Sequence, residues 1–233
     1  GPEAVMAHAK TFERLCMGQL HETLPRPAGT DPVDHYIQVL ADKTGSLIAV
    51  SARYGAMLTG AGERTERIVE DFGEKIGVAF QLADDVIDLV SDSATTGKTP
   101  GTDLREGVDT MPVLLLRKAL AAGELDAAGQ AILSRLSTGD LSDDAFLADV
   151  VAHLREHPVL ARTREMAMAW AAEAVQGLAG LEKAVLDGTR QRLAESGVEG
   201  AAAAALLADA GERVVQVRAA MEDFARILVD RAA

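Results

Sequence analysis

The segment Gly77–Val90, GVAFQLADDVIDLV, limits the possible folds of this chain more than any other segment. Its only polar side chains are Gln81, Asp84, Asp85 and Asp88. These four follow the spacing i, i+3, i+4 and i+7, so they lie on one narrow stripe of a helix. Every other direction is apolar, and the helix must therefore be covered by other elements on nearly all sides.

The elements that cover this helix are themselves expected to be helical. Aromatic residues make up only 3% of the 233 residues, and Ala, Leu, Glu and Arg are abundant, which favours helices over sheets. The apolar patterns predict helices over residues 3–24, 32–53 (loosened near Gly45), 64–90, 111–122, 158–186 and 200–233, with another helix opening near residues 142–144. We therefore expect an all-α protein whose residues 1–233 form a single domain.

The acidic stripe predicts a metal-assisted anion site. Three carboxylates on one edge of a buried helix repel one another and lose hydration, so they need compensating cations. Oxygen ligands select hard cations, and Mg²⁺ held by a few carboxylates typically binds substrate phosphates as well. An ordinary solvated acidic face is the alternative, but such a face would include lysines, whereas Phe80, Leu82 and Val86 flank the acids here. We interpret the stripe as a platform for Mg²⁺ and a diphosphate.

Two lysines are candidates for contacting the same anion. Lys43 falls at matching spacing within the apolar stripe of Tyr36 and Leu40, and a lysine on an inward face needs a partner. A simple ion pair, or a stem that reaches out to solvent, is the alternative. Lys98 lies with Asp103 in SDSATTGKTPGTDL, a segment whose composition predicts a loop. Such a loop could close backbone donors and a cation over a phosphate.

Composition argues against several other functions. The chain has 23 Lys and Arg against 36 Asp and Glu, a net charge of −13, and no basic cluster offers a footprint for nucleic acid. The longest apolar run, Ala201–Ala208, is far shorter than a membrane span, so we expect no integral membrane segment. The single cysteine, Cys16, fits a reducing cytoplasm and is expected to be buried.

Two short motifs are rejected as functional sites. Gly97-Lys98-Thr99 resembles the end of a P-loop, but Asp92 stands where the first glycine is required, and a helix rather than a strand precedes it. The run HLREH, His153–His157, matches a zinc pattern but has no evident third ligand.

The segment FQLADDVIDLVSDSATTGKTPGTDLREGVDTMP resembles the second aspartate-rich region of the trans-isoprenyl diphosphate synthases, the polyprenyl synthetase family. Upstream, MGQLHET resembles the family's Gly-Gln-x-x-acid helix and DKTG resembles its Lys-Thr kink. Near the end, FARILVDR resembles the closing family helix. The resemblance implies an isoprenoid-synthase-type helical bundle around a central cavity, of which this chain is the C-terminal portion, and a homodimer.

The resemblance also implies an enzyme that needs Mg²⁺ and condenses an allylic diphosphate with isopentenyl diphosphate to give a longer trans-polyprenyl diphosphate. The implied roles are Mg²⁺ binding by Asp84, Asp85 and Asp88, and binding of the allylic diphosphate by Gln81, Lys43, Thr44 and Lys98, of which Lys43, Thr44 and Lys98 are the implied catalytic residues. Gln19, Glu22 and Asp103 would be supporting polar groups, and Phe80 would line the site near the second substrate.

The sequence departs from the family pattern at two places. Val108 stands where the family usually has Lys, so we expect a lower affinity for diphosphate. The family's first aspartate-rich motif, expected well before Gly18, is absent, and the chain opens on Gly1-Pro2 without a methionine. We therefore expect the N-terminal helices of the domain to be missing and this chain alone to be inactive. Two alternatives stay open: a non-catalytic or regulatory subunit of a prenyl synthase, and a terpene cyclase that ionises a diphosphate.

Overall fold

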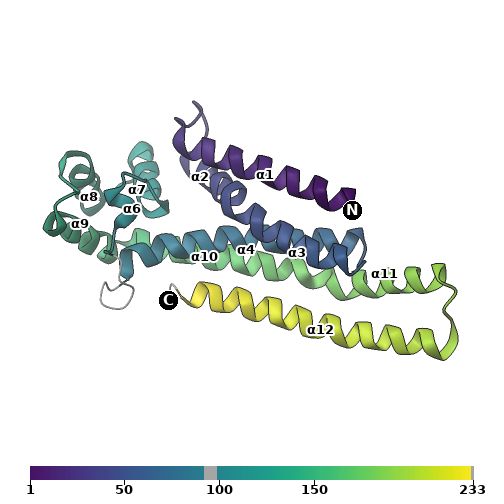
Figure 1. Ribbon diagram of the computed structural model, residues 1–233. Helices are drawn as coiled ribbons and strands as arrows, with labels where there is room; N and C mark the ends of the chain where they lie inside the picture. Colours follow the sequence, from purple (N-terminus) through teal and green to yellow (C-terminus); the bar gives the residue numbers. More distant parts are fainter. Residues whose placement is uncertain (92–98, 232–233) are drawn as a thin grey trace.

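The computed structural model describes residues 1–91 and 99–231, and every regular element in these ranges is helical (Figure 1). The first elements are α1 (Pro2–Thr23), α2 (Pro32–Leu40), the π-helix η1 (Ala41–Gly45), α3 (Ser46–Leu58) and α4 (Glu63–Val90). They are followed by α6 (Thr102–Arg105), α7 (Met111–Ala122), α8 (Ala127–Thr138), α9 (Asp144–Glu156), α10 (Pro158–Gly177), the 3₁₀-helix η2 (Leu178–Gly180), α11 (Leu181–Glu195) and α12 (Gly200–Asp230). The all-α prediction is confirmed.

Helix α4 runs through the middle of the molecule, with α3 and α10 packed along it and α12 close to α10 and α11 (Figure 1). The side chains of Val78, Leu82 and Val86 on α4 are completely buried. Periodicity therefore identified the central helix correctly, because a helix that is apolar in most directions can only be stable inside a bundle.

Two apolar clusters divide the length of α4. Toward its C-terminal end, Leu82 packs in a cluster that includes Met111 of α7 and Leu154 of α9. Toward its N-terminal end, Ile76 packs in a second cluster with Leu178 of η2. The short helices α6 to α9 gather at the acidic end of α4 (Figure 1), so they determine the surroundings of the stripe.

Local capping residues explain two helix starts, and the first of them, Asp31-Pro32, is recognisable from the sequence as an N-cap followed by Pro at the first helical position. The Asp31 carboxylate accepts hydrogen bonds from the backbone N–H groups of Val33 and Asp34, and Pro32 occupies the first position of α2. Asp143 caps α9 in the same way by accepting from the backbone N–H of Phe146.

The helix expected over residues 32–53, with loosening near Gly45, consists of three elements. The π-helix η1 separates α2 from α3 at the position where loosening was expected, and α3 continues past residue 53 to Leu58. The helix ends there because Gly60 and Gly62 take left-handed backbone angles, with φ of 67° and 92°.

The prediction of one helix over residues 158–186 is also wrong in detail. The turn η2 divides it beside Gly177 and Gly180, and α11 extends to Glu195 before Gly197 ends it with φ of 65°. Helix α8 was not predicted at all, although Asp126 caps it by accepting from the backbone N–H of Gly129.

Cys16 is exposed on α1, contrary to the expectation that it is buried. Over the described part of the chain, no helix combines the length and the apolar character needed to cross a membrane.

Candidate functional site

Asp85 is the buried member of the acidic stripe, with 5% of its surface exposed. The hydroxyl of Tyr36 on α2 donates to both of its carboxylate oxygens, at 3.1 and 3.2 Å, and the backbone N–H of Met111 donates to Oδ2 at 3.0 Å. One carboxylate thus joins α4 to α2 and to the N-terminus of α7, where the helix dipole favours a negative charge.

The electrostatics of Asp85 reflect this burial. The pKa of Asp85 is raised to about 8, mainly by loss of hydration. The hydrogen bonds from Met111 and Tyr36 oppose this rise, and the nearby charges of Asp103 and Asp84 add to it. Burial and the neighbouring carboxylate of Asp85 likewise raise the pKa of Tyr36 far above its usual value. The structure therefore brings Asp84, Asp85 and Asp103 into one electrostatic neighbourhood.

Asp88 lies at the edge of the stripe that faces α6. Its Oδ1 accepts from the backbone N–H of Thr102 at 3.2 Å, and its carbonyl oxygen accepts from the N–H of Gly101 at 2.9 Å. These bonds attach the start of α6 to the last turns of α4. Asp84 and Asp88 are both half-buried, which leaves their carboxylates closer to solvent than that of Asp85.

Lys43 and Thr44 lie in the π-helix η1. The Lys43 ammonium pairs with Glu22 of α1, with Nζ and Oε2 2.6 Å apart, and Gln19 donates to the same Glu22 oxygen at 2.9 Å. Lys43 thus has an ion-pair partner in this structure, and its role toward an anion stays a prediction. The structure also brings together Gln19, Glu22 and Lys43, three residues that the resemblance assigned to one site.

Phe80 and Gln81 occupy the turn of α4 that precedes Asp84, and both are half-buried. The guanidinium of Arg231, just after α12, lies over the Phe80 ring at 5.6 Å from its centroid, a distance typical of a cation–π contact. The closing helix therefore returns a positive charge to the acidic end of α4. The predicted substrate residue Lys98 lies outside the described residues.

The predicted metal ligands are not gathered into one cluster of three donors. Within residues 1–91 and 99–231, no group of three or more His, Cys, Asp or Glu side chains is arranged to hold a metal ion. The histidines of the rejected zinc motif have local roles instead: His157 accepts from the backbone N–H of Val159 and caps α10, and His153 Nδ1 contacts the carbonyl oxygen of Asp149.

A large apolar cavity opens beside the N-terminal half of α4. Its volume is about 1170 Å³, and helices α3, α4, α11 and α12 contribute its walls. Apolar side chains that line it include Val69, Phe72, Leu181, Val185, Val214 and Met221. The hydroxyl of Thr65, also in this wall, is buried without a hydrogen-bond partner among the described residues. The cavity and the acidic stripe thus lie toward opposite ends of the same helix.

Sequence reasoning missed two polar residues that the structure places at the site. Tyr36 was interpreted only as part of an apolar stripe, although a buried tyrosine hydroxyl usually needs a partner. Arg14 was not singled out, yet it pairs with Asp42, which directly precedes Lys43. The spacing of Arg14, Gly18 and Glu22 at i, i+4 and i+8 was the available signal.

The helical bundle is similar to solved structures of prenyl diphosphate synthases. A geranylgeranyl pyrophosphate synthase from Corynebacterium glutamicum, solved with calcium and isoprenyl diphosphate, superposes with a TM-score of 0.71 and 30% identity over 100% of this chain and 61% of that one. A decaprenyl diphosphate synthase from Rhodobacter capsulatus superposes with a TM-score of 0.69 and 26% identity, over 100% of this chain and 61% of that one.

The family follows from sequence comparison. The polyprenyl synthetase model matches residues 2–138, and a nonaprenyl diphosphate synthase of Mycobacterium tuberculosis is 40% identical over 179 residues, which is 77% of this chain and 52% of that protein. The chain belongs to the polyprenyl synthetase family. It spans about half the length of the curated relatives that it matches.

Proposed function

We propose that the protein represented by this chain is a Mg²⁺-dependent prenyltransferase that condenses an allylic diphosphate with isopentenyl diphosphate into a longer trans-polyprenyl diphosphate. The observation that carries the proposal is the acidic stripe at the C-terminal end of α4, in a member of the polyprenyl synthetase family. Named relatives that synthesise nonaprenyl and geranylgeranyl diphosphates support it.

The donor chemistry of the stripe fits Mg²⁺. Carboxylate oxygens are the ligands that this cation prefers, and Asp84 and Asp88 are half-buried rather than sealed in the core. Asp85 belongs to the metal-binding set as well, but only 5% of its surface is exposed. We therefore assign direct ligation first to Asp84 and Asp88, whose side chains are less buried. When bound, the cation neutralises the charge that develops on the departing diphosphate.

The residues around the stripe have complementary roles. The Lys43 ammonium and the Gln81 amide are donors that suit diphosphate oxygens, Thr44 adds a hydroxyl beside Lys43, and Lys98 adds a second cation. Donors placed where negative charge accumulates stabilise the transition state more than the bound substrate. As the allylic C–O bond breaks, the double bond of isopentenyl diphosphate forms the new C–C bond and a proton is then lost from the adduct.

The hydrocarbon part of the substrate needs a dry environment, since an allylic cation reacts with water. The cavity of about 1170 Å³ beside α4 is walled mainly by apolar side chains, and it supports binding of an isoprenoid chain whose diphosphate end lies at the stripe. Gly73, the wall residue of α4 nearest to Asp84, is 11 positions away, or roughly 16 Å along the helix.

Titration of inorganic diphosphate tests the binding half of the proposal. We expect heat of binding in the presence of Mg²⁺ and none in a chelator, because the stripe and the diphosphate otherwise repel each other. Asp84→Asn should weaken the Mg²⁺-dependent affinity at least tenfold, which is about 1.4 kcal/mol. Asp71→Asn is the matched control, since Asp71 is an exposed acid on α4 that pairs with Lys75. Tight binding in chelator would contradict the proposal.

An elongation assay with labelled isopentenyl diphosphate and a short allylic diphosphate tests the chemistry. It should be run on this chain and on a version extended at its N-terminus, because condensation needs both diphosphate sites in one cavity. A second function is favoured by one relative, a heptaprenyl diphosphate synthase component 2 of Geobacillus stearothermophilus, 29% identical over 77% of this chain and 53% of that protein. Diphosphate binding without condensation in either version would favour a non-catalytic subunit.

We also propose a homodimer located in the cytoplasm. Helix α1 and the residue that follows it expose large apolar side chains, a surface typical of protein interfaces: Val5, Met6, Phe12, Met17, Leu20 and Leu24. The exposed thiol of Cys16 on the same helix suits a reducing compartment. Sedimentation equilibrium should give twice the chain mass, and Phe12→Glu should lower it; a monomer at all concentrations would contradict the dimer.

A further inference from the structure

The π-helix η1 is an irregular support for the two residues that the proposed function assigns to diphosphate binding, Lys43 and Thr44. A π-turn widens the helix by one residue and is stable only where surrounding contacts hold it. In η1, the backbone N–H of Ser46 reaches the carbonyl of Ala41, and the buried hydroxyl of Ser46 donates to the carbonyl of Asp42 at 2.6 Å. These local bonds close the wide turn, but they do not fix its position in the bundle.

One face of α1 fixes that position from one side. Arg14, Gly18 and Glu22 follow at intervals of four residues and all contact η1. Arg14 Nε donates to Asp42 Oδ1 at 2.8 Å, and Glu22 pairs with Lys43 at 2.6 Å. Between them, a Cβ at Gly18 would lie only 2.9 Å from the backbone nitrogen of Lys43, so the two backbones are in close contact at Gly18.

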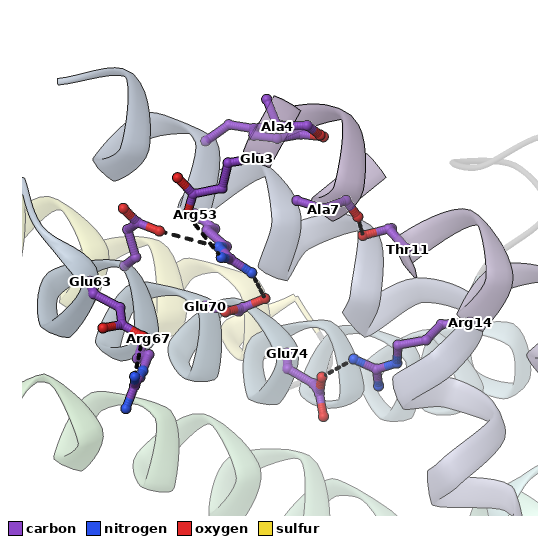
Figure 2. A network of polar contacts seen from close by, with 12 residues as sticks. Glu3, Ala4, Ala7, Thr11, Arg14, Arg53, Glu63, Arg67, Glu70 and Glu74 are labelled. Atoms are coloured by element: carbon purple, nitrogen blue, oxygen red, sulfur yellow. Dashed lines mark hydrogen bonds and ion pairs between the residues drawn. The ribbon is translucent and has the colours of Figure 1, made fainter. Parts of the chain in front are cut away.

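Helix α4 fixes η1 from the other side. A Cβ at Gly77 would lie 2.4 Å from the Cα of Gly45, and one at Gly45 would lie 2.9 Å from the carbonyl oxygen of Glu74. Arg14 reaches across to this helix as well, because its Nη1 donates to the Glu74 carboxylate (Figure 2). The guanidinium therefore joins α1, η1 and α4 at one point.

The partner of Arg14 in η1 is a buried and fully engaged carboxylate. Only 8% of the Asp42 surface is exposed, and its second oxygen accepts from Gln38 Nε2 at 2.9 Å. Removing one partner of such a carboxylate leaves a buried charge without compensation. The turn that contains Lys43 would then have to shift so that Asp42 regains contact with water.

From these contacts we propose that Arg14 is a positioning residue of the diphosphate site: it holds Asp42 and Glu74 together, and so keeps η1 in the place that presents Lys43 and Thr44. The inference rests on the proposed function, because its consequence is measured as diphosphate binding. Arginine suits this task better than lysine, since its planar group donates to two carboxylates in different directions.

Arg53 offers a matched control within the same chain. It also joins α1, α3 and α4, by pairing with Glu3, Glu66 and Glu70, as Figure 2 shows beside Arg14. Its side chain is 24% exposed, compared with 37% for Arg14, and Glu3, Glu66 and Glu70 all lie outside η1. A role in stability alone predicts similar effects for the two arginines, whereas a positioning role predicts different ones.

The test compares Arg14→Met, Asp42→Asn and Arg53→Met, which remove a charge while keeping most of the side-chain length or volume, with Arg14→Lys, which keeps the charge but loses the planar guanidinium. Titration with inorganic diphosphate and Mg²⁺ measures the site, and hydrogen exchange of the amides at positions 42–46 without ligand measures the support. We expect Arg14→Met and Asp42→Asn to weaken diphosphate binding at least tenfold and to speed this exchange, with partial recovery in Arg14→Lys. Arg53→Met should do neither, even where its melting temperature falls as much.

The outcomes separate this inference from the proposed function. Binding and exchange in Arg14→Met that match those of Arg53→Met would overturn the positioning role while leaving the diphosphate site in place. A wild-type chain that binds no diphosphate with Mg²⁺ would overturn the proposed function and, with it, the link from Arg14 to diphosphate. Faster exchange confined to the Arg14 and Asp42 variants, together with their weaker binding, supports both.

Discussion

Tyr36→Phe is the substitution that most directly tests the buried Asp85 contact. It removes only the hydroxyl that donates to both Asp85 oxygens at 3.1 and 3.2 Å, and it leaves the ring and the Met111 N–H in place. The folded chain then holds a buried carboxyl with one donor fewer. The cost of the change depends on whether that carboxyl is charged, so it depends on pH.

The magnitude follows from the pKa of Asp85, which burial raises to about 8. At pH 9 the folded carboxyl is ionised, and loss of a hydrogen bond to a charged group costs about 1.5–3 kcal/mol. At pH 6 it is protonated, and loss of a neutral bond costs about 0.5–1.5 kcal/mol. The Tyr36 hydroxyl keeps its proton at both values, because burial and then the Asp85 charge raise its pKa above the usual 10.

Thermal unfolding in chelator at pH 6 and pH 9 measures the difference, since chelation keeps divalent cations from the stripe. At pH 9 we expect the melting temperature to fall by roughly 3–12 °C, at about 2–4 °C per kcal/mol for a chain of this size. Tyr54→Phe is the matched control, because its hydroxyl donates to a neutral backbone carbonyl, Ala4 O, at 3.0 Å. Equal losses at both pH values, or a larger loss at pH 6, would refute the reasoning.

Three other substitutions test separate parts of the fold by the same unfolding measurement. Gly77→Ala should lower the free energy of unfolding by about 1–3 kcal/mol, because the new methyl group would overlap Gly45. Gly55→Ala is the control: its methyl group meets nothing within 4 Å among the described residues, so this change should raise the free energy of unfolding by up to about 1 kcal/mol. Folding raises the pKa of Asp85 from 3.8 to about 8, so its contribution to stability is fully present below about pH 4 and is lost as the pH rises through about 8. Asp85→Asn should therefore flatten this decline of stability with pH. An unchanged slope of stability against pH would contradict the prediction. Arg155→Ala should cost about 1 kcal/mol, because Arg155 donates to the carbonyls of Leu89 and Ser91 at the C-terminal end of α4. Arg162→Ala is the control, since Arg162 forms an exposed ion pair with Glu165. A loss in Arg155→Ala no larger than that in the control would show that this cap contributes nothing.

The elements that the sequence predicted well are those set by near neighbours in the chain. The period of apolar residues around Leu82 and Val86 reports burial directly, because each residue contributes to the pattern whatever its partner is. The Asp31-Pro32 cap is similarly local, as its hydrogen bonds span two and three residues. Both could be stated without knowing how the helices pack.

The π-helix and the partners of the site residues depend on distant contacts instead. The one-residue widening at Ala41–Gly45 is held by Gly18 and Gly77 from other helices, and nothing in the local propensity of ADKTG demands it. Tyr36 and Asp85 are 49 residues apart, so no spacing rule links them. The metal-binding, substrate-binding and catalytic roles themselves remain predictions, because they concern ligands rather than the packing of the chain.

The paired aspartates of the stripe show why a motif that looks uniform has unequal members. Adjacent residues on an α-helix point about 100° apart, so Asp84 and Asp85 cannot present their carboxylates in the same direction. Asp85 turns toward Tyr36 and the N-terminus of α7, while Asp84 and Asp88, four residues apart, share a face. In this geometry the hydrogen bonds of the buried carboxylate join α4 to α2 and α7. The other two carboxylates point in a different direction, which is the one from which we expect a cation to approach.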